Sequence, residues 1–261
     1  MIESLTRRIA VGLEYDGSAF RGWQRQEAGV RTVQGVLEQA LSRVADHPVQ
    51  LHCAGRTDAG VHASAQVVHF DTRAERRERA WVLGANANLP ADVSVNWARP
   101  VAADFHARFS ARSRRYRYRI LNRPVRSALY RQQAVWCHWP LDTGRMQQAA
   151  QALVGEHDFS SFRALGCQAR SPIREITELG IRREGELVIL EVQANAFLHH
   201  MVRNIAGVLM AIGRGEQPVD WAAEVLARRD RTRGGVTAPA QGLCLIGVGY
   251  PAVFELPGPR T

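Results

Sequence analysis

The spacing of the apolar residues changes repeatedly along the first hundred positions, and this change constrains the fold more than any other feature. In RRIAVGLEYDG every second residue from Ile9 to Tyr15 is apolar or aromatic, which is typical of a strand. In TVQGVLEQALSRVA the apolar residues from Val33 to Val44 follow helical spacing, and Thr32 stands at the N-cap position. The sequence therefore predicts a strand followed by a helix.

The same alternation continues to the end of this half of the chain. Two apolar runs, VQLHCAG and AQVVHFDT, predict strands that flank a short loop. A helix is expected around ERAWVLGANANL and a further strand at VSVNWARPV. The resulting order of strand, helix, two strands, helix and strand matches the ferredoxin-like unit, which is also the sheet plan of RNA-recognition domains.

The second half repeats this order loosely. Strands are expected at RRYRYRIL, AVWCHWP and LCLIGVGY, helices at GRMQQAAQALVG, HHMVRNIAGVLMAIG and DWAAEVLARR, and a hairpin at IREITELGIRREGELVILEVQANAF. We therefore predict an α+β fold of two ferredoxin-like subdomains with mainly antiparallel sheets, residues 1–105 and 106–251, and a loose tail, 252–261. Two such units side by side would leave a cleft suited to an extended polymer.

The chain is strongly basic. Its formal charge is +9, its isoelectric point is near 10.3, and arginine supplies the positive charge. Because the guanidinium fork matches phosphate, nucleic acid is the first partner to consider, although a solvated basic surface explains the charge equally well. The chain has no signal-peptide pattern and no apolar run of membrane-spanning length, so we expect a cytoplasmic, soluble protein. Its four cysteines form no CxxC pair, which argues against a zinc ribbon.

The segment CAGRTDAGVHA, residues 53–63, is the first candidate for chemistry. Gly55 and Gly60 permit a sharp turn that would present Arg56, Thr57 and Asp58 at its tip. Asp58 can be explained as a turn residue whose side chain binds nearby backbone. Alternatively, Asp58 acts as an ionised carboxylate near a reacting carbon, and a cationic neighbour would favour that form.

A second candidate is the strand RSRRYRYRI. Period-two alternation places Arg115, Arg117 and Arg119 on one face and Tyr116 and Tyr118 on the other. An amphipathic strand with two half-buried tyrosines accounts for this pattern. We assign Tyr118 to the core. The arginine face and the segment RRDRTRGG are plausible phosphate contacts, without a role for any single residue.

The third candidate is FLHHMVRNIAGVLM, where Arg203 falls away from the apolar stripe of a helix. The small residues Ala206 and Gly207 would let another backbone or an RNA approach closely. His199 and His200 suggest a metal site, but adjacent residues on a helix point about 100° apart and share a metal poorly. No HExxH or comparable ligand set is present in the sequence, so we predict no metal.

Several motifs together resemble one enzyme family. GRTDAGVHA, EYDGSAFRGWQRQ, FHARFSARSRRYRY, DFSSFR and NAFLHHMVRNIAG follow the order and spacing of the tRNA pseudouridine synthase A (TruA) family over nearly the whole chain. The resemblance implies two α+β subdomains flanking a basic, RNA-binding cleft, and a homodimer. It also implies isomerisation of uridine to pseudouridine at positions 38, 39 and 40 in the anticodon stem-loop of tRNA, without cofactor or metal.

The resemblance also implies roles for individual residues. Asp58 matches the catalytic aspartate, and Arg56 matches the arginine that fills the gap left by a flipped base. Tyr116 matches the tyrosine that stacks on the target uracil, a use that suits a π face. Arg203 matches the arginine paired with the catalytic aspartate. Leu243, in QGLCL, occupies the place of a stretch beside the pocket.

Two other functional classes compete with this interpretation. A non-catalytic RNA-binding module would use the same sheets, but it gains nothing from an acid that faces phosphates. The joint presence of Asp58, Tyr116 and Arg203 favours the enzyme. A metal-dependent hydrolase lacks the ligand set it would need in this sequence.

Overall fold

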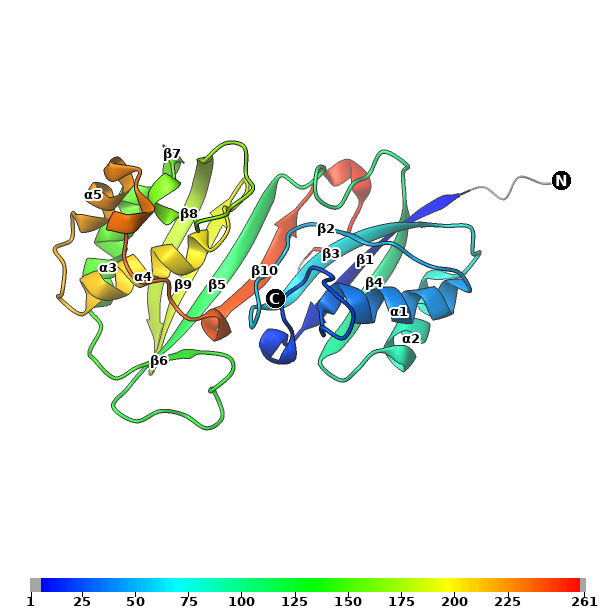
Figure 1. Cartoon of the computed structure of the whole chain (residues 1–261), viewed down its shortest axis with the longest axis horizontal. Coiled ribbons are helices and arrows are strands. Elements are labelled where there is room, and N and C mark those ends of the chain that lie inside the picture. The colour runs from blue at the N-terminus through cyan, green and yellow to red at the C-terminus, as the bar shows by residue number, and fades with distance from the viewer. Residues whose placement is uncertain (1–5, 259–261) are drawn as a thin grey trace. The chain divides into compact units, whose positions relative to one another are not determined.

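The computed structural model describes residues 6–258 (Figure 1). These residues form two compact units: 6–112 together with 245–258, and 113–244. The first unit thus runs to residue 112, and it includes residues from 245 on, which we expected in the second subdomain. The subdomain boundaries stay a prediction.

The first unit contains the predicted succession of elements. Its strands are β1 (Arg7–Tyr15), β2 (His52–Cys53), β3 (His62–Thr72), β4 (Val93–Val101) and most of β10 (Leu243–Gly249), and its helices are α1 (Val33–Ala45) and α2 (Glu78–Asn88). The strand order is β4-β1-β3-β10, and β2 also pairs with β3. β1 runs antiparallel to both β3 and β4.

Both faces of β1 are buried, although its sequence alternates. The helices α1 and α2 pack against each other, and α2 packs against β4 (Figure 1). A cluster of buried hydrophobic residues in the first unit includes Ala10 and Phe105, and Phe254 packs against it. The ring centroids of Phe105 and Phe254 are 5.1 Å apart. The described part of the expected loose tail, 252–258, is therefore not loose but packed within the first unit. Residues 259–261 lie outside the described part of the chain.

The second unit is a sheet covered by helices. Its strands are β5 (Ser113–Asn122), β6 (Val135–Cys137), β7 (Gly155–Asp158), β8 (Ile173–Glu184) and β9 (Leu187–Ala194), and its helices are α3 (Thr143–Ala150), α4 (Met201–Gly213) and α5 (Trp221–Arg228). The order is β5-β9-β8-β7, with antiparallel pairs, and β6 lies parallel to β5. The sequence did not predict β7, because GEHD has no apolar alternation.

Short 3-10 turns connect these elements, at Gly17–Ala19, Gln151–Leu153, Ser160–Phe162, Arg231–Arg233, Ala240–Gly242 and Ala252–Phe254. Taken together the fold is α+β, as the sequence predicts. The finer ferredoxin-like plan stays a prediction. In the described part of the chain, no helix has the length and apolar character needed to cross a bilayer.

Candidate active site

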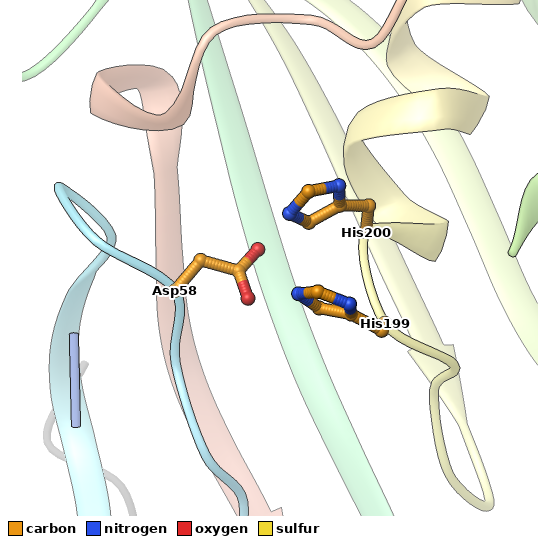
Figure 2. A group of neighbouring side chains, drawn as sticks. All are labelled: Asp58, His199 and His200. Carbon is orange, nitrogen blue, oxygen red and sulfur yellow. The ribbon is translucent and has the colours of Figure 1, made fainter. Parts of the chain in front are cut away.

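Asp58 lies on the loop that joins β2 to β3 (Figure 2). Its side chain is partly exposed, Arg56 is exposed, and Thr57 between them is buried. Gly60 has a φ of +77°, the left-handed conformation that favours glycine, whereas Gly55 is not left-handed. The left-handed turn therefore follows Asp58, and the chain also bends before it, at residues 54–55.

The turn after Asp58 is closed by the main chain. The Val61 N–H donates to the Asp58 carbonyl oxygen at 3.1 Å, so the turn uses the backbone of Asp58. A second segment of the same unit supports the loop from outside. The Trp23 N–H donates to the Thr57 carbonyl at 2.9 Å, and the Gly60 N–H donates to the Phe20 carbonyl at 3.4 Å. The loop is therefore held by backbone bonds on both sides of Asp58.

The nearby thiol of Cys53 can be set aside as a nucleophile. Burial raises the pKa of Cys53 to about 12, and the positive charge of Arg56 offsets only part of this effect. Because the thiolate is the reactive form, Cys53 is inert at neutral pH.

The tyrosines of β5 follow the predicted alternation. Tyr118 is fully buried, and its hydroxyl donates to the Pro239 carbonyl at 2.8 Å, which confirms its assignment to the core. Burial raises the pKa of Tyr118, although the charge of Arg203 opposes that shift. Tyr116 is 8% exposed, and its ring meets the ring of Phe197 edge-on, with 5.1 Å between centroids.

Arg203 lies in the first turn of α4 and is half-buried. Its Nε donates to the Ala238 carbonyl at 2.8 Å, and the Ala238 N–H donates to the Arg203 carbonyl at 3.1 Å. A methyl group on Gly207 would lie 1.8 Å from the Val236 carbonyl oxygen. The small residues of α4 therefore admit another backbone, as predicted, and that backbone belongs to residues 236–238 of the same unit.

The argument from helical geometry against a metal at His199 and His200 is wrong. Both residues precede α4 (Figure 2), and His200 has a φ of +62°. Their ring centroids are 4.0 Å apart, so the two rings lie side by side. The absence of a metal requirement thus stays a prediction without that support.

Carboxylates occupy part of the arginine face of β5. Glu191 on β9 accepts from Arg117 Nε at 2.7 Å and lies 3.3 Å from a guanidinium nitrogen of Arg115. Arg182 also contacts Glu191, at 3.1 Å. This face is therefore a network of ion pairs, which weakens the expectation that Arg115 and Arg117 serve as phosphate contacts.

Leu243 is the first residue of β10 and is buried. Of the candidate residues, Arg56 and Asp58 share one loop of the first unit, and Tyr116, Arg203 and Leu243 belong to the second. Sequence reasoning did not identify Gln66, whose buried amide donates to the Gly55 carbonyl of the Asp58 loop at 2.7 Å. The only signal for Gln66 is that it is a polar residue inside the apolar run AQVVHF.

Comparison with known proteins gives a consistent result. A family model described as tRNA pseudouridine synthase matches residues 13–110 and 149–251. The chain is 62% identical over 250 residues to tRNA pseudouridine synthase A of Pseudomonas aeruginosa, covering 96% of this chain and 88% of that protein. It is 63% identical over 249 residues to the enzyme of the same name from Methylococcus capsulatus, with 95% and 92% covered. Arg56, Asp58, Arg203 and Leu243 fall within the matched ranges, whereas Tyr116 lies between them.

Proposed function

Because the chain belongs to the tRNA pseudouridine synthase A family, it is an isomerase that converts uridine to pseudouridine in tRNA, and we propose that Asp58 carries this reaction. The reaction breaks the bond between uracil and C1′ of the ribose, turns the base, and joins C1′ to its C5. A carboxylate can start this sequence in two ways, by attack on C1′ or by removal of the C2′ proton. Both ways require an ionised acid close to the ribose.

One observation carries the assignment to Asp58. The loop is held by backbone bonds on both sides of Asp58, because the Thr57 carbonyl accepts the Trp23 N–H and the Gly60 N–H donates to the Phe20 carbonyl. The acid therefore sits on a supported loop. Such support suits a group that must keep a fixed geometry.

The reaction also needs the uracil to leave its stack, at a cost of a few kcal/mol. We assign to Arg56, which is exposed and two residues before the acid, the filling of the gap that the base leaves. Tyr116 would stack on the turned-out uracil with the part of its ring that Phe197 does not cover. Arg203 would supply the cation that keeps Asp58 ionised, and Leu243 would form part of the pocket wall.

The wider proposal is action on uridines 38, 39 and 40 of the anticodon stem-loop by a homodimer that requires neither cofactor nor metal. The net charge of +9 supports a phosphate-rich substrate. A basic cleft and ferredoxin-like subdomains belong to the same proposal. The loop that precedes β6 (Figure 1) carries exposed apolar side chains, including Leu129 at 90% exposure, which suit a contact between copies of the chain.

An unmodified tRNA transcript with uridine at positions 38, 39 and 40 tests the proposed target. After incubation with the protein, pseudouridine is mapped along the whole transcript. We expect modification at these three positions and a loss of product when all three are changed to cytidine. Modification confined to the D-arm or T-arm would contradict the anticodon assignment.

A further inference from the structure

Three buried polar side chains lie behind the Asp58 loop within the first unit. Tyr15 at the end of β1 is 4% exposed, Gln66 on β3 is fully buried, and Thr57 in the loop is 7% exposed. β1 and β3 are neighbours in the sheet, with Leu13 opposite Gln66 and a shift of register before Tyr15. Because polar groups are costly to bury without hydrogen bonds, their partners show what they hold in place.

These side chains bind two residues of the loop. The hydroxyls of Tyr15 and Thr57 are hydrogen-bonded at 2.8 Å. The Gln66 amide donates to the Gly55 carbonyl at 2.7 Å and to the Tyr15 hydroxyl oxygen at 3.4 Å. A purely apolar group would fill the same space without fixing the loop to one position. The bonds therefore tie the loop to the sheet at Gly55 and at Thr57.

Along the loop, the residues that are hydrogen-bonded to the sheet alternate with residues that are exposed to solvent. Gly55 and Thr57 are held inward, whereas Arg56 is exposed and Asp58 is partly exposed. Thr57 is held from two sides, since its carbonyl also accepts the Trp23 N–H. Fixing the residue immediately before Asp58 restricts where the Asp58 backbone, and hence its carboxylate, can lie.

We propose that Tyr15, Thr57 and Gln66 are positioning residues for the isomerisation, which hold the Asp58 loop through the Tyr15–Thr57 hydroxyl bond and the Gln66–Gly55 bond. This inference rests on the proposed catalytic role of Asp58. Catalytic groups must stay within about 0.5 Å of their productive geometry, and a displacement of about 1 Å can cost on the order of 100-fold in rate. Since the three side chains are buried, their loss acts on the rate constant rather than on tRNA capture.

The test compares matched substitutions in the full-length protein. Thr57→Val keeps the shape of the side chain but removes the hydroxyl, and Thr57→Ser keeps the hydroxyl. Tyr15→Phe removes the same bond from the other side. Thr72→Val is the control, because Thr72 is a buried threonine of the same unit whose hydroxyl binds His47 at 2.7 Å, away from the loop. Each variant is assayed for kcat, for KM with tRNA, and for Tm.

We expect Thr57→Val and Tyr15→Phe each to lower kcat by about 10- to 100-fold with KM changed less than about threefold. Thr57→Ser should retain activity near that of the wild type. The double variant should be no worse than the poorer single variant, because both changes remove the Tyr15–Thr57 bond and Thr57→Val removes nothing from the Gln66–Tyr15 bond. Thr72→Val should lower Tm but leave kcat unchanged. If Thr57→Val fails to fold, the comparison of kcat between Tyr15→Phe and Thr72→Val tests the positioning role.

Equal kcat values for Thr57→Val, Tyr15→Phe and Thr72→Val would overturn the positioning role. Asp58→Asn, assayed in parallel, separates the two proposals. An inactive Asp58→Asn beside fully active Thr57→Val and Tyr15→Phe contradicts the positioning role alone. An active Asp58→Asn overturns both the role of Asp58 and the positioning inference.

Discussion

Gly22 lies against the backbone of Thr57, with a φ of +95° that L side chains rarely adopt. A methyl group on Gly22 would come within 3.0 Å of the Thr57 carbonyl oxygen and 3.2 Å of the Ala59 nitrogen. The next residue, Trp23, donates its N–H to the same Thr57 carbonyl at 2.9 Å. The segment RGW of the first unit is therefore fitted directly to the loop that carries Asp58.

This contact predicts that Gly22→Ala disturbs catalysis and not stability alone. Gly29 is the matched control, since its φ is +87° but a methyl group there would meet nothing within 4 Å. Both substitutions should lower stability by about 1 kcal/mol or more through backbone strain. Only Gly22→Ala should also lower kcat, by about tenfold or more, because it shifts the Asp58 loop. Urea unfolding and single-turnover assays measure the two effects, and equal kcat losses in both variants would refute the contact's role.

The sequence predicted the secondary structure well where patterns were strong. The strands β1 and β5 and the helix α1 were confirmed, and Thr32 caps α1 by accepting from the Gly35 N–H at 3.3 Å. The packing of residues 252–258 was not predicted, because Phe254 and Leu256 gave no sign in the sequence of the Phe105 cluster against which they pack. Local pattern describes an element, whereas its packing partner lies far away in sequence.

In the candidate site, too, contacts between residues distant in sequence could not be predicted from local pattern. Asp58 and Tyr116 were identified through motif resemblance, but the support behind the loop from Gln66 depends on the pairing of β1 with β3. The carboxylate at Glu191 that faces Arg115 and Arg117 likewise follows from the register of β5 with β9. Period-two alternation defines one face of a strand, but it does not give the charges on the neighbouring strand.

A cluster of three histidines in the first unit predicts a pH-dependent stability. The ring centroids of His69 and His106 are 4.5 Å apart, and His52 stacks on His69 at 5.0 Å. The His69 Nδ1 accepts the Ala107 N–H, and the His106 Nδ1 accepts the Arg108 N–H, both at 3.1 Å. Burial, together with the charges of His106, Arg8 and His52, lowers the pKa of His69 to about 3.

Below an unfolded pKa of about 6.5, the unfolded chain binds a proton at His69 that the folded chain does not. The contribution of neutral His69 to stability is thus fully present above that pH and is lost as the pH falls toward 3. In the wild type, this proton uptake should raise the unfolding equilibrium constant by up to about tenfold for each unit that the pH falls. His69→Asn keeps an acceptor near the Nδ1 position and should remove this contribution. Urea unfolding between pH 7.5 and 4.5 measures this, with the exposed His138→Asn as control. A wild-type pH profile in His69→Asn would contradict the expectation.

Glu191 is predicted to stabilise the second unit. Burial would raise its pKa, but hydrogen bonds from Arg117 and Arg182 outweigh burial and lower the pKa of Glu191 below its usual range. Glu191→Gln should therefore cost about 1–3 kcal/mol, since the surrounding guanidinium groups lose their counter-charge. Glu224→Gln, which affects only the exposed pair with Arg228, should cost less than about 0.5 kcal/mol. Similar Tm values for the two variants would show that the Glu191 network contributes nothing.

Metal removal should leave the reaction intact. The isomerisation imports no group and changes no oxidation state, so it gives a divalent ion no necessary task. Protein dialysed against a chelator should retain kcat on tRNA that was folded beforehand. His199→Ala and His200→Ala, assayed with and without added zinc or manganese, test the adjacent histidines. Restoration of lost activity by one of these ions in the wild type alone would contradict metal independence.

The most direct test of the role of Asp58 is the pseudouridine yield of Asp58→Asn, measured with its Tm and its tRNA affinity. Asparagine keeps the shape of the side chain but removes its charge and nucleophilicity. We expect turnover to fall below detection, tRNA affinity to hold or rise, and stability to change by no more than about 0.5 kcal/mol, as for a surface substitution. Near-normal yield with lowered stability would instead identify Asp58 as a turn residue and place the catalytic acid elsewhere.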